Sequence, residues 1–390
     1  MHVRNAAATV SADEREGAGL QRANILVIGG GIGGLTAAIA LRRKGFEVEV
    51  IEKDPDWTVY GVGIIQQANV IRAMSELGIL EAYLGAAFGF DHVEIYLPDG
   101  RLAARTPSPR LVEGRPANLG VSRPALQKVL GDSAKAAGAT IRLGVTALEL
   151  DDDGDGVDVA FSDGSRGRYD FVVGADGLYS ETRDRLFPDA PEPEFTGQSV
   201  WRYNFPRPPE LDCLQAYEGP MGIGLVPLSD NLMYMYVTTP EPGNPRYPRQ
   251  GLAAAMRGRL AKAPPAMAPL AAQITEDAEV VYRPVDCVLL EGPWHKGRVV
   301  LIGDAVHATT PHLGQGAGMA IEDAMVLAEE LVRAPTPEAG FEAYRQRRFD
   351  RCAFICRLSR SICDAQLGKR PPVDYAGLNR DMFELMAKPA

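Results

Sequence analysis

A glycine-rich turn near the start of the chain, GGGIGG from Gly29 to Gly34, most constrains what this sequence can fold into. The turn follows a short apolar run from Asn24 (NILVIG), which is typical of a buried parallel strand. A helix-like segment, residues 35–44, comes next, and a β-rich run then ends at Glu52. Strand, glycine turn, helix and strand in this order predict a βαβ unit that binds a dinucleotide.

Each part of this turn has a physical task. Gly29 permits the tight bend, Gly31 lets the backbone approach a pyrophosphate, and Gly34 lets helix and strand pack closely. The N–H groups at the start of the helix would bind the phosphates. Glu52, eighteen residues after Gly34, could accept hydrogen bonds from a ribose diol. We expect the turn to contact the dinucleotide through Gly29, Gly31, Ile32, Gly33 and Gly34.

Composition and charge exclude several classes of protein. The chain has 390 residues, of which 46% are hydrophobic and 24% charged, as in an ordinary globular protein of two or three structural units. Its 51 acidic against 41 basic residues give a formal charge of -10, which disfavours a nucleic-acid partner or an anionic membrane. No apolar stretch is long enough to predict a membrane-spanning helix.

The cysteines and the N-terminus indicate the compartment. Five cysteines, an odd number without a CxxC pair, fit free thiols in a reducing cytoplasm, so we expect neither disulfides nor a metal. Cys352 and Cys356, one helical turn apart, are expected to be small apolar helix residues. Residues 1–23 lack the pattern of a secretory signal and are expected to form a disordered polar extension.

Two later loops carry further candidate residues. In segment 169–180 (YDFVVGADGLYS), a buried strand runs into an Asp-Gly turn at Asp176, which read alone is a turn followed by the helix-capping residue Ser180. In segment 297–318, a strand delivers Asp304 to its carboxyl end, where ligands bind in open α/β sheets. A glycine-rich loop then opens a long helix whose N-terminus carries a partial positive charge.

These three motifs, in this order, resemble the single-component FAD-dependent aromatic hydroxylases, the group related to p-hydroxybenzoate, salicylate and 3-hydroxybenzoate hydroxylases. The resemblance spans about residues 24–345 and rests on GxGxxG, a central DG and a late GD followed by P-x-x-G-Q-G. It implies a bound FAD, because the chain holds only one dinucleotide fingerprint, and NADH or NADPH as a transient co-substrate.

The resemblance also implies individual FAD contacts. Glu52 and Lys53 would lie at the adenosine ribose, and Asp304 at the ribityl chain. Asp176 would serve both FAD and the pyridine nucleotide. The remaining implied contacts are Arg123, Gly316 and Ala317, with Gln127 as a weaker match. The chain departs from the family pattern at Ala68, Tyr203 and His312, which puts the substrate rather than the cofactor in question.

The implied reaction is hydroxylation of a small phenolic or N-heteroaromatic compound, with NAD(P)H and O₂ consumed and a flavin C4a-hydroperoxide as the oxygen donor. An epoxidase, or a decarboxylating or ring-modifying monooxygenase, would carry the same motifs. A non-catalytic FAD-binding redox sensor is the alternative from another class.

Candidates for substrate contact are Arg202, Tyr217 and His312. Arg202 could bind a substrate carboxylate bidentately or form a structural ion pair. His312 could accept a phenolic proton at neutral pH or be a satisfied loop histidine, whereas His307 is expected to be structural. In the run LMYMYVTT, Tyr234 and the tyrosine two residues on share one face of a strand, and the two methionines share the other.

The chain is therefore expected to be an α/β protein. It would have a Rossmann-type FAD-binding domain, a mostly antiparallel β-sheet substrate domain and C-terminal helices, because proline-rich short strands dominate residues 190–290. The expected ranges are 24–85, 116–188 and 290–335 for FAD binding, 86–115 and 189–289 for substrate, and 336–390 for the helical segment. Either a monomer or a homodimer would fit.

Overall fold

The computed structural model describes residues 22–219 and 221–390, so that only the last two residues of the predicted extension lie within it. The predicted βαβ unit lies at the centre of a six-stranded sheet in the order β18-β19-β12-β1-β2-β8. The strands are β18 (His295–Lys296), β19 (Val299–Leu301), β12 (Phe171–Gly174), β1 (Asn24–Ile28), β2 (Glu47–Glu52) and β8 (Thr140–Leu143). All neighbouring pairs are parallel except β18 and β19.

This parallel arrangement places all three sequence motifs at one edge of the sheet. The glycine turn follows β1, the Asp-Gly turn follows β12, and the late Gly-Asp pair follows β19. Because β12 lies directly between β1 and β19, the three loops are neighbours although they are far apart in the sequence.

The two faces of the sheet are buried differently. Ile25 and Val27 belong to a large core shared with helices, whereas Leu26 and Ile28, which alternate with them, pack toward a small antiparallel sheet. The small sheet consists of β9 (Ala147–Asp152), β10 (Val157–Phe161) and β11 (Arg166–Tyr169). On the helical side, α2 (Ile32–Arg43) packs against α5 (Arg123–Ala136) and α10 (Gly316–Arg333).

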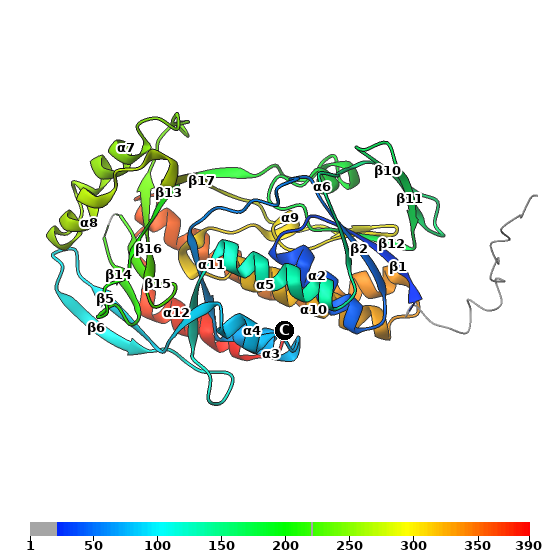
Figure 1. The fold of residues 1–390 in the computed structure, drawn as a ribbon, viewed down its shortest axis with the longest axis horizontal. Coiled ribbons are helices and arrows are strands. Elements are labelled where there is room, and N and C mark those ends of the chain that lie inside the picture. Colours follow the sequence, from blue (N-terminus) through cyan, green and yellow to red (C-terminus); the bar gives the residue numbers. More distant parts are fainter. Residues whose placement is uncertain (1–21, 220) are drawn as a thin grey trace, which may run out of the picture.

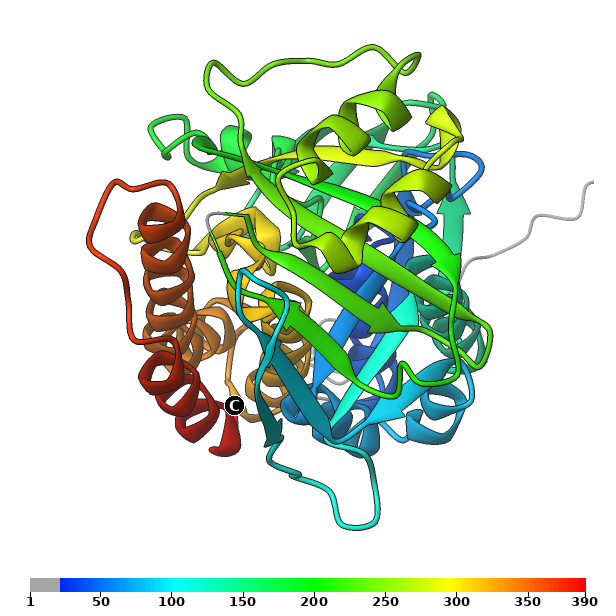
Figure 2. The ribbon, with the colours of Figure 1, turned by 90° about the vertical axis from the view of Figure 1, so that its left-hand side faces the viewer.

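A seven-stranded sheet forms the other end of the molecule (Figure 1). In spatial order it contains β17 (Val281–Cys287), β13 (Glu194–Pro206), β16 (Leu232–Pro240), β15 (Ile223–Pro227), β14 (Leu214–Tyr217), β5 (His92–Tyr96) and β6 (Leu102–Pro107). Its outer face is covered by α7 (Leu252–Leu260) and α8 (Ala268–Gln273), as Figure 2 shows. All its pairs are antiparallel except β14 with β5.

A third antiparallel sheet and the remaining helices join the two ends. The sheet is formed by β3 (Gly63–Gln67), β7 (Asn118–Ser122) and β4 (Ala87–Phe90). The shorter helices are α3 (Ala68–Glu76), α4 (Leu80–Leu84), α6 (Glu181–Leu186) and α9 (Asp304–His307), with short 3₁₀ turns that include η4 (Pro311–Leu313). The C-terminal helices α11 (Pro337–Gln366) and α12 (Tyr375–Ala387) run along one side of the molecule (Figure 2).

The predicted fold class is therefore confirmed, and the differences lie at helix starts. The helix after the glycine turn begins at Ile32 rather than at residue 35, because Gly31 is its extended N-cap and two further glycines are helical. The sequence also predicts a long helix over residues 340–366. This helix begins at Pro337 instead, with the side chain of Thr336 accepting a hydrogen bond from the Ala339 N–H. Proline is favoured in the first helical turn, where its missing N–H costs nothing.

Candidate active site

The glycine turn is shaped by contacts that exclude side chains at two positions and leave space at a third. Gly29 has a φ of +110°, and a Cβ there would lie 2.4 Å from the carbonyl oxygen of Ala175. A Cβ at Gly34 would lie 1.9 Å from the carbonyl oxygen of Gly29. At Gly31, by contrast, a Cβ would meet no protein atom within 4 Å. The open space above Gly31, at the N-terminus of α2, is the space that a pyrophosphate requires.

Glu52 closes this turn at the end of β2. Its carboxylate accepts hydrogen bonds from the N–H groups of Gly30, at 2.9 Å, and Asp54, at 2.9 Å. The carbonyl oxygen of Gly30 in turn accepts hydrogen bonds from Trp57 Nε1 and from Gln127 Nε2, at 2.9 and 2.7 Å. Glu52 therefore orients the turn, while the neighbouring Lys53 is exposed beside it.

Asp176, in the central Asp-Gly turn, has its carboxylate engaged within the protein. It accepts hydrogen bonds from the Ser180 hydroxyl and from the N–H and hydroxyl of Thr182. Ser180 is the N-cap of α6, as predicted, and accepts from the Arg183 N–H. Asp176 thus fixes the shape of its loop, and a contact with a cofactor would be made by the loop that it holds.

Asp304 presents the least engaged carboxylate of the three loops. It follows Gly303, whose φ is +63°, and begins the short helix α9. Within residues 22–219 and 221–390, no donor lies at hydrogen-bonding distance from its carboxylate, and the residue is exposed. Surrounding protein nevertheless raises the pKa of this carboxyl by desolvation, although His307 and Arg123 oppose the shift. The Asp304 carboxylate is thus available to accept a hydrogen bond from a ribityl hydroxyl. Together with the open N-terminus of α2 above Gly31, it fits the needs of FAD.

Arg123, the first residue of α5, and Arg202, on β13, face the same interior region. Desolvation lowers the pKa of both guanidinium groups, and the repulsion of Arg123 contributes to bringing the pKa of Arg202 to about 10. In the described part of the chain, no carboxylate lies within ion-pair distance of either group. Two neighbouring cations without a carboxylate at ion-pair distance indicate a binding region for an anion.

The inner face of the seven-stranded sheet continues this region. Arg202 on β13 is directly opposite Tyr236 on β16, and Asn204 is opposite Tyr234 in the same register. A Cβ at Gly224 would lie 2.1 Å from the Tyr236 ring, so the glycine leaves room for that ring on the face. Burial raises the pKa of Tyr234, against the opposing charges of both arginines, so its phenol stays neutral. The two tyrosines share one face, as expected.

Tyr217 is not brought to this face. It pairs with Ile223, which packs in the outer core under α7 together with the methionines of β16. Its ring stacks on Tyr96 with ring centroids 4.6 Å apart, and 7% of the residue is exposed. The side chain therefore supports the sheet from the side opposite Arg202, and we leave it out of the proposed substrate contacts.

His312 lies in η4, just before the glycine-rich start of α10, where Gly316 and Ala317 form the first turn. Its Nδ1 is 3.0 Å from the Thr310 hydroxyl and its Nε2 is 3.0 Å from Gln366 Oε1, so both ring nitrogens have partners. Burial lowers the pKa of His312 to about 4, and the imidazole is therefore neutral at physiological pH.

Comparison with known proteins identifies the cofactor. The family described as "FAD binding domain" matches residues 22–357. This chain belongs to that family. It is 31% identical over 358 residues to the putative FAD-dependent monooxygenase YetM of Bacillus subtilis, covering 89% of this chain and 95% of the relative. It is 32% identical to the 3-hydroxybenzoate 6-hydroxylase of Polaromonas naphthalenivorans, covering 87% and 86%.

A solved structure agrees with these sequence relatives. The structure of Klebsiella pneumoniae HpxO complexed with FAD and uric acid superposes with a TM-score of 0.80 at 26% identity, covering 94% of this chain and 93% of that one. The predicted enzyme class and cofactor are confirmed: the protein is an FAD-dependent monooxygenase. Across the part of the monooxygenase that is described, no helix combines the length and apolar character needed to cross a membrane.

Sequence reasoning assigned no role to several residues that hold the motif loops in place. Trp57 binds the glycine turn from a loop that carries no motif. Arg183 donates to the carbonyl oxygens of Leu178 and Ala305, at 2.9 and 3.2 Å, and so joins the loops after β12 and β19. Gln315, the N-cap of α10, exchanges hydrogen bonds with Asn69 on α3. The sequence shows that these polar residues stand near the motifs. It does not show that they are buried, which is the property that would have singled them out.

The pKa of His312 leads to a prediction on stability. The unfolded chain binds a proton at this residue near pH 6.5, whereas the folded protein binds it only near pH 4. The unfolded state therefore binds more protons between these values, and stability falls as the pH drops through this window, by at most about 1.4 kcal/mol per pH unit. In the variant His312→Gln, the free energy of unfolding should fall less steeply as the pH drops from 6.5 to 4. Urea unfolding of both proteins at pH 7.0, 5.5 and 4.5 measures it, and parallel curves would contradict the assignment.

Proposed function

We propose that this monooxygenase hydroxylates a small, negatively charged phenolic or N-heteroaromatic compound, using NADH or NADPH as reductant and O₂ as oxygen source. The observation that carries the proposal is the Arg202 guanidinium. It lies on the inner face of the seven-stranded sheet, and no carboxylate of the described residues lies within ion-pair distance of it. A partly buried cation of this kind is stabilised when an anionic ligand binds.

Arg202 has the properties that recognition of an anion requires. With a pKa of about 10 it is still protonated at neutral pH, and a guanidinium offers two parallel N–H donors to a carboxylate. Tyr234 and Tyr236 flank it on the same face and can pack along an aromatic ring. The substrate would thus be held by its charge at one end and by ring contacts along its length.

The FAD is proposed to lie between the inner face of the seven-stranded sheet, which carries Arg202, and the six-stranded sheet that contains β1. The glycine turn and the loops after β12 and β19 would hold it, with Arg123 at the boundary between the two sheets. When bound, FAD supplies the oxygen-activating chemistry. The proposed contacts are Gly29, Gly31, Ile32, Gly33, Gly34, Glu52, Lys53, Arg123, Asp176, Asp304, Gly316 and Ala317.

His312 is the proposed proton acceptor for a phenolic substrate. Its imidazole is neutral, and Nε2–H donates to Gln366 Oε1, so Nδ1 carries the electron pair that would accept a proton. Its hydrogen bonds to Thr310 and Gln366 would fix the ring orientation, and one of them would have to exchange for the substrate hydroxyl. Dense packing of Met233, Met235 and Val237 behind the tyrosine face would help exclude water from that side of the sheet.

The relatives support an anionic aromatic substrate. One is named as a hydroxylase of 3-hydroxybenzoate, which carries a carboxylate, and the HpxO structure holds uric acid. Epoxidation or oxidative decarboxylation would use the same FAD site, so the product decides between these reactions. A redox sensor would bind FAD without turning over any substrate.

The proposal is tested by following NADH and NADPH oxidation by the FAD-loaded protein with hydroxybenzoates, hydroxypyridines and hydroxyquinolines. We expect an anionic compound to stimulate oxidation at least about tenfold and to give a product one oxygen atom heavier by mass spectrometry. The matched control is the neutral methyl ester or amide of the same compound, which should stimulate far less. Equal stimulation by acid and ester would contradict the role of Arg202, and no hydroxylated product from any compound would contradict the reaction.

A further inference from the structure

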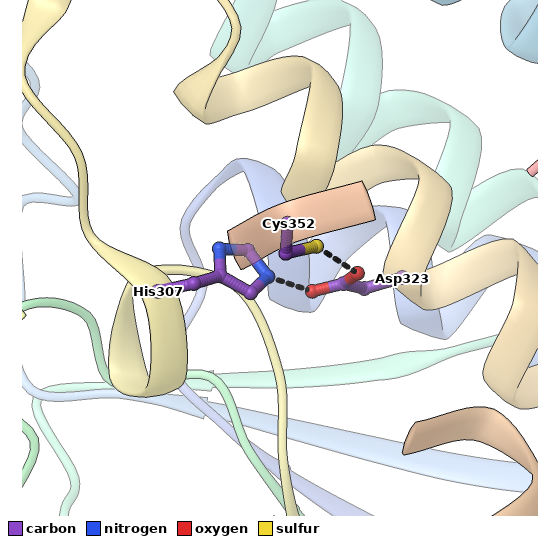
Figure 3. Close-up of side chains that lie close together, drawn as sticks. All are labelled: His307, Asp323 and Cys352. Carbon is purple, nitrogen blue, oxygen red and sulfur yellow. Dashed lines mark hydrogen bonds and ion pairs between the residues drawn. The ribbon is translucent and has the colours of Figure 1, made fainter. Parts of the chain in front are cut away.

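Three polar side chains from different helices meet in the interior below the FAD loops (Figure 3). They are His307 at the end of α9, Asp323 on α10 and Cys352 on α11, and all three are fully buried. One potential ligand atom from each residue lies within 4.8 Å of the others. None of the three was predicted to share a site with another.

The charges around this cluster identify it as an ion-pair network rather than a metal site. Arg348 Nε donates to Asp323 Oδ1 at 2.8 Å, and Arg348 Nη2 lies 3.6 Å from Cys352 Sγ. Burial alone would lower the pKa of His307, but the Asp323 carboxylate outweighs burial and raises it. A metal ion would share this space with a guanidinium and an imidazolium, whose repulsion opposes its entry.

Asp323 holds both ends of the short helix that begins with Asp304. Its Oδ2 accepts from the Gly303 N–H at 2.9 Å, immediately before Asp304, and lies 2.5 Å from His307 Nε2, three residues after it. Arg348 holds the other oxygen of the same carboxylate. Because Gly303 has a left-handed backbone, this hydrogen bond also helps fix the angle at which the loop leaves β19.

The neighbouring residue, Glu322, is connected in a similar way to the start of α10, which follows the late glycine-rich loop. Its Oε1 accepts from Asn69 Nδ2 at 3.0 Å, and the same amide donates to Gln315 Oε1 at 3.1 Å. Gln315 is the N-cap of α10, directly before Gly316. Arg348 also donates to Glu322, at 2.8 Å, and so bridges the two acids.

We infer that Glu322 and Asp323 are positioning residues for the FAD site, Asp323 for the loop that carries Asp304 and Glu322 for the start of α10. Neither touches the cofactor region directly, and each acts through the loop that it holds. This role concerns cofactor binding and does not depend on which substrate is hydroxylated. It extends beyond the motif residues, which are all in the loops themselves.

The test compares FAD binding with protein stability in matched variants. Asp323→Asn keeps the size of the side chain but removes the charge that holds His307 and Arg348. We expect its dissociation constant for FAD to rise about tenfold or more, the factor that one charge-assisted hydrogen bond commonly contributes. The visible absorption bands of the bound flavin should also shift. Asp350→Asn, the same change at an exposed position on α11, should alter neither.

Two further variants separate positioning from folding. His307→Gln breaks one of the contacts of Asp323 and keeps its pairing with Arg348, so it carries the test if Asp323→Asn does not fold. Glu322→Gln should shift the flavin bands through Gln315. A lower melting temperature of the FAD-free protein with unchanged FAD affinity and an unchanged flavin spectrum would overturn the inference, since it would show a purely structural role. Tight, stoichiometric zinc or iron in the purified protein would overturn it as well.

Discussion

Replacing Arg202 with glutamine is expected to raise the KM for an anionic substrate about a hundredfold while FAD stays bound. Removing one member of a buried, hydrogen-bonded charge pair commonly costs about 2–5 kcal/mol, because the other charge is left buried without a partner. Arg202→Lys keeps the charge but loses the two parallel donors, so its KM should lie between the two proteins. Steady-state kinetics with the best anionic compound from the oxidation assay measures this order.

Tyr217→Phe provides the control on the same sheet. Tyr217 lies on the opposite face, and among the described residues its hydroxyl makes only a 3.5 Å contact with Gln215, so loss of the hydroxyl should leave KM unchanged. The pH dependence gives a second check, because Arg202 loses its charge as the pH rises through about 10. In FAD-loaded protein, substrate affinity should therefore be constant near neutral pH and weaken above pH 10. An Arg202→Gln variant with normal KM would remove Arg202 from the site.

The parts of the fold that sequence could predict are those with local signals. The sequence predicts a long helix over residues 316–333, since a glycine-rich loop precedes it and an Ala-Pro pair follows, and α10 has these bounds. The three motif loops meet at one sheet edge because parallel strands deliver all their carboxyl ends to the same side. The order of strands in the sheet, which makes these loops neighbours, rests on long-range pairing and is not written in any one segment.

The substrate half of the site was harder to predict for a related reason. Arg123 follows a strand of one sheet and Arg202 lies within another, so their proximity depends on how two sheets stack. Tyr217 lies on a strand of four residues, in which alternation shows two faces but not which one is inside. Cys352 fits an apolar helix position by sequence, yet its hydrogen-bond partner Asp323 is 29 residues away on another helix.

Two glycine-to-alanine substitutions in the glycine turn should distinguish a glycine that folding requires from a glycine that FAD binding requires. Gly34→Ala places a methyl group 1.9 Å from the Gly29 carbonyl oxygen, a separation that requires the strand and helix to move apart. We expect the free energy of unfolding of the FAD-free protein to fall by about 3 kcal/mol or more. Gly31→Ala meets no protein atom within 4 Å and has an ordinary backbone conformation, so the FAD-free protein should stay within about 0.5 kcal/mol of the parent.

The affinity for FAD should not follow this order of stability. Gly31→Ala, which hardly changes the free energy of unfolding, should weaken FAD binding. The methyl group of Gly31→Ala occupies the space where a pyrophosphate would approach the N–H groups of α2, so the FAD dissociation constant should rise about tenfold or more even though the protein is folded. Urea unfolding of the FAD-free proteins and titration with FAD, followed by flavin fluorescence, measure the two effects separately. A Gly31→Ala protein that binds FAD normally would place the pyrophosphate elsewhere. A Gly34→Ala protein of normal stability would show that strand and helix can separate without cost.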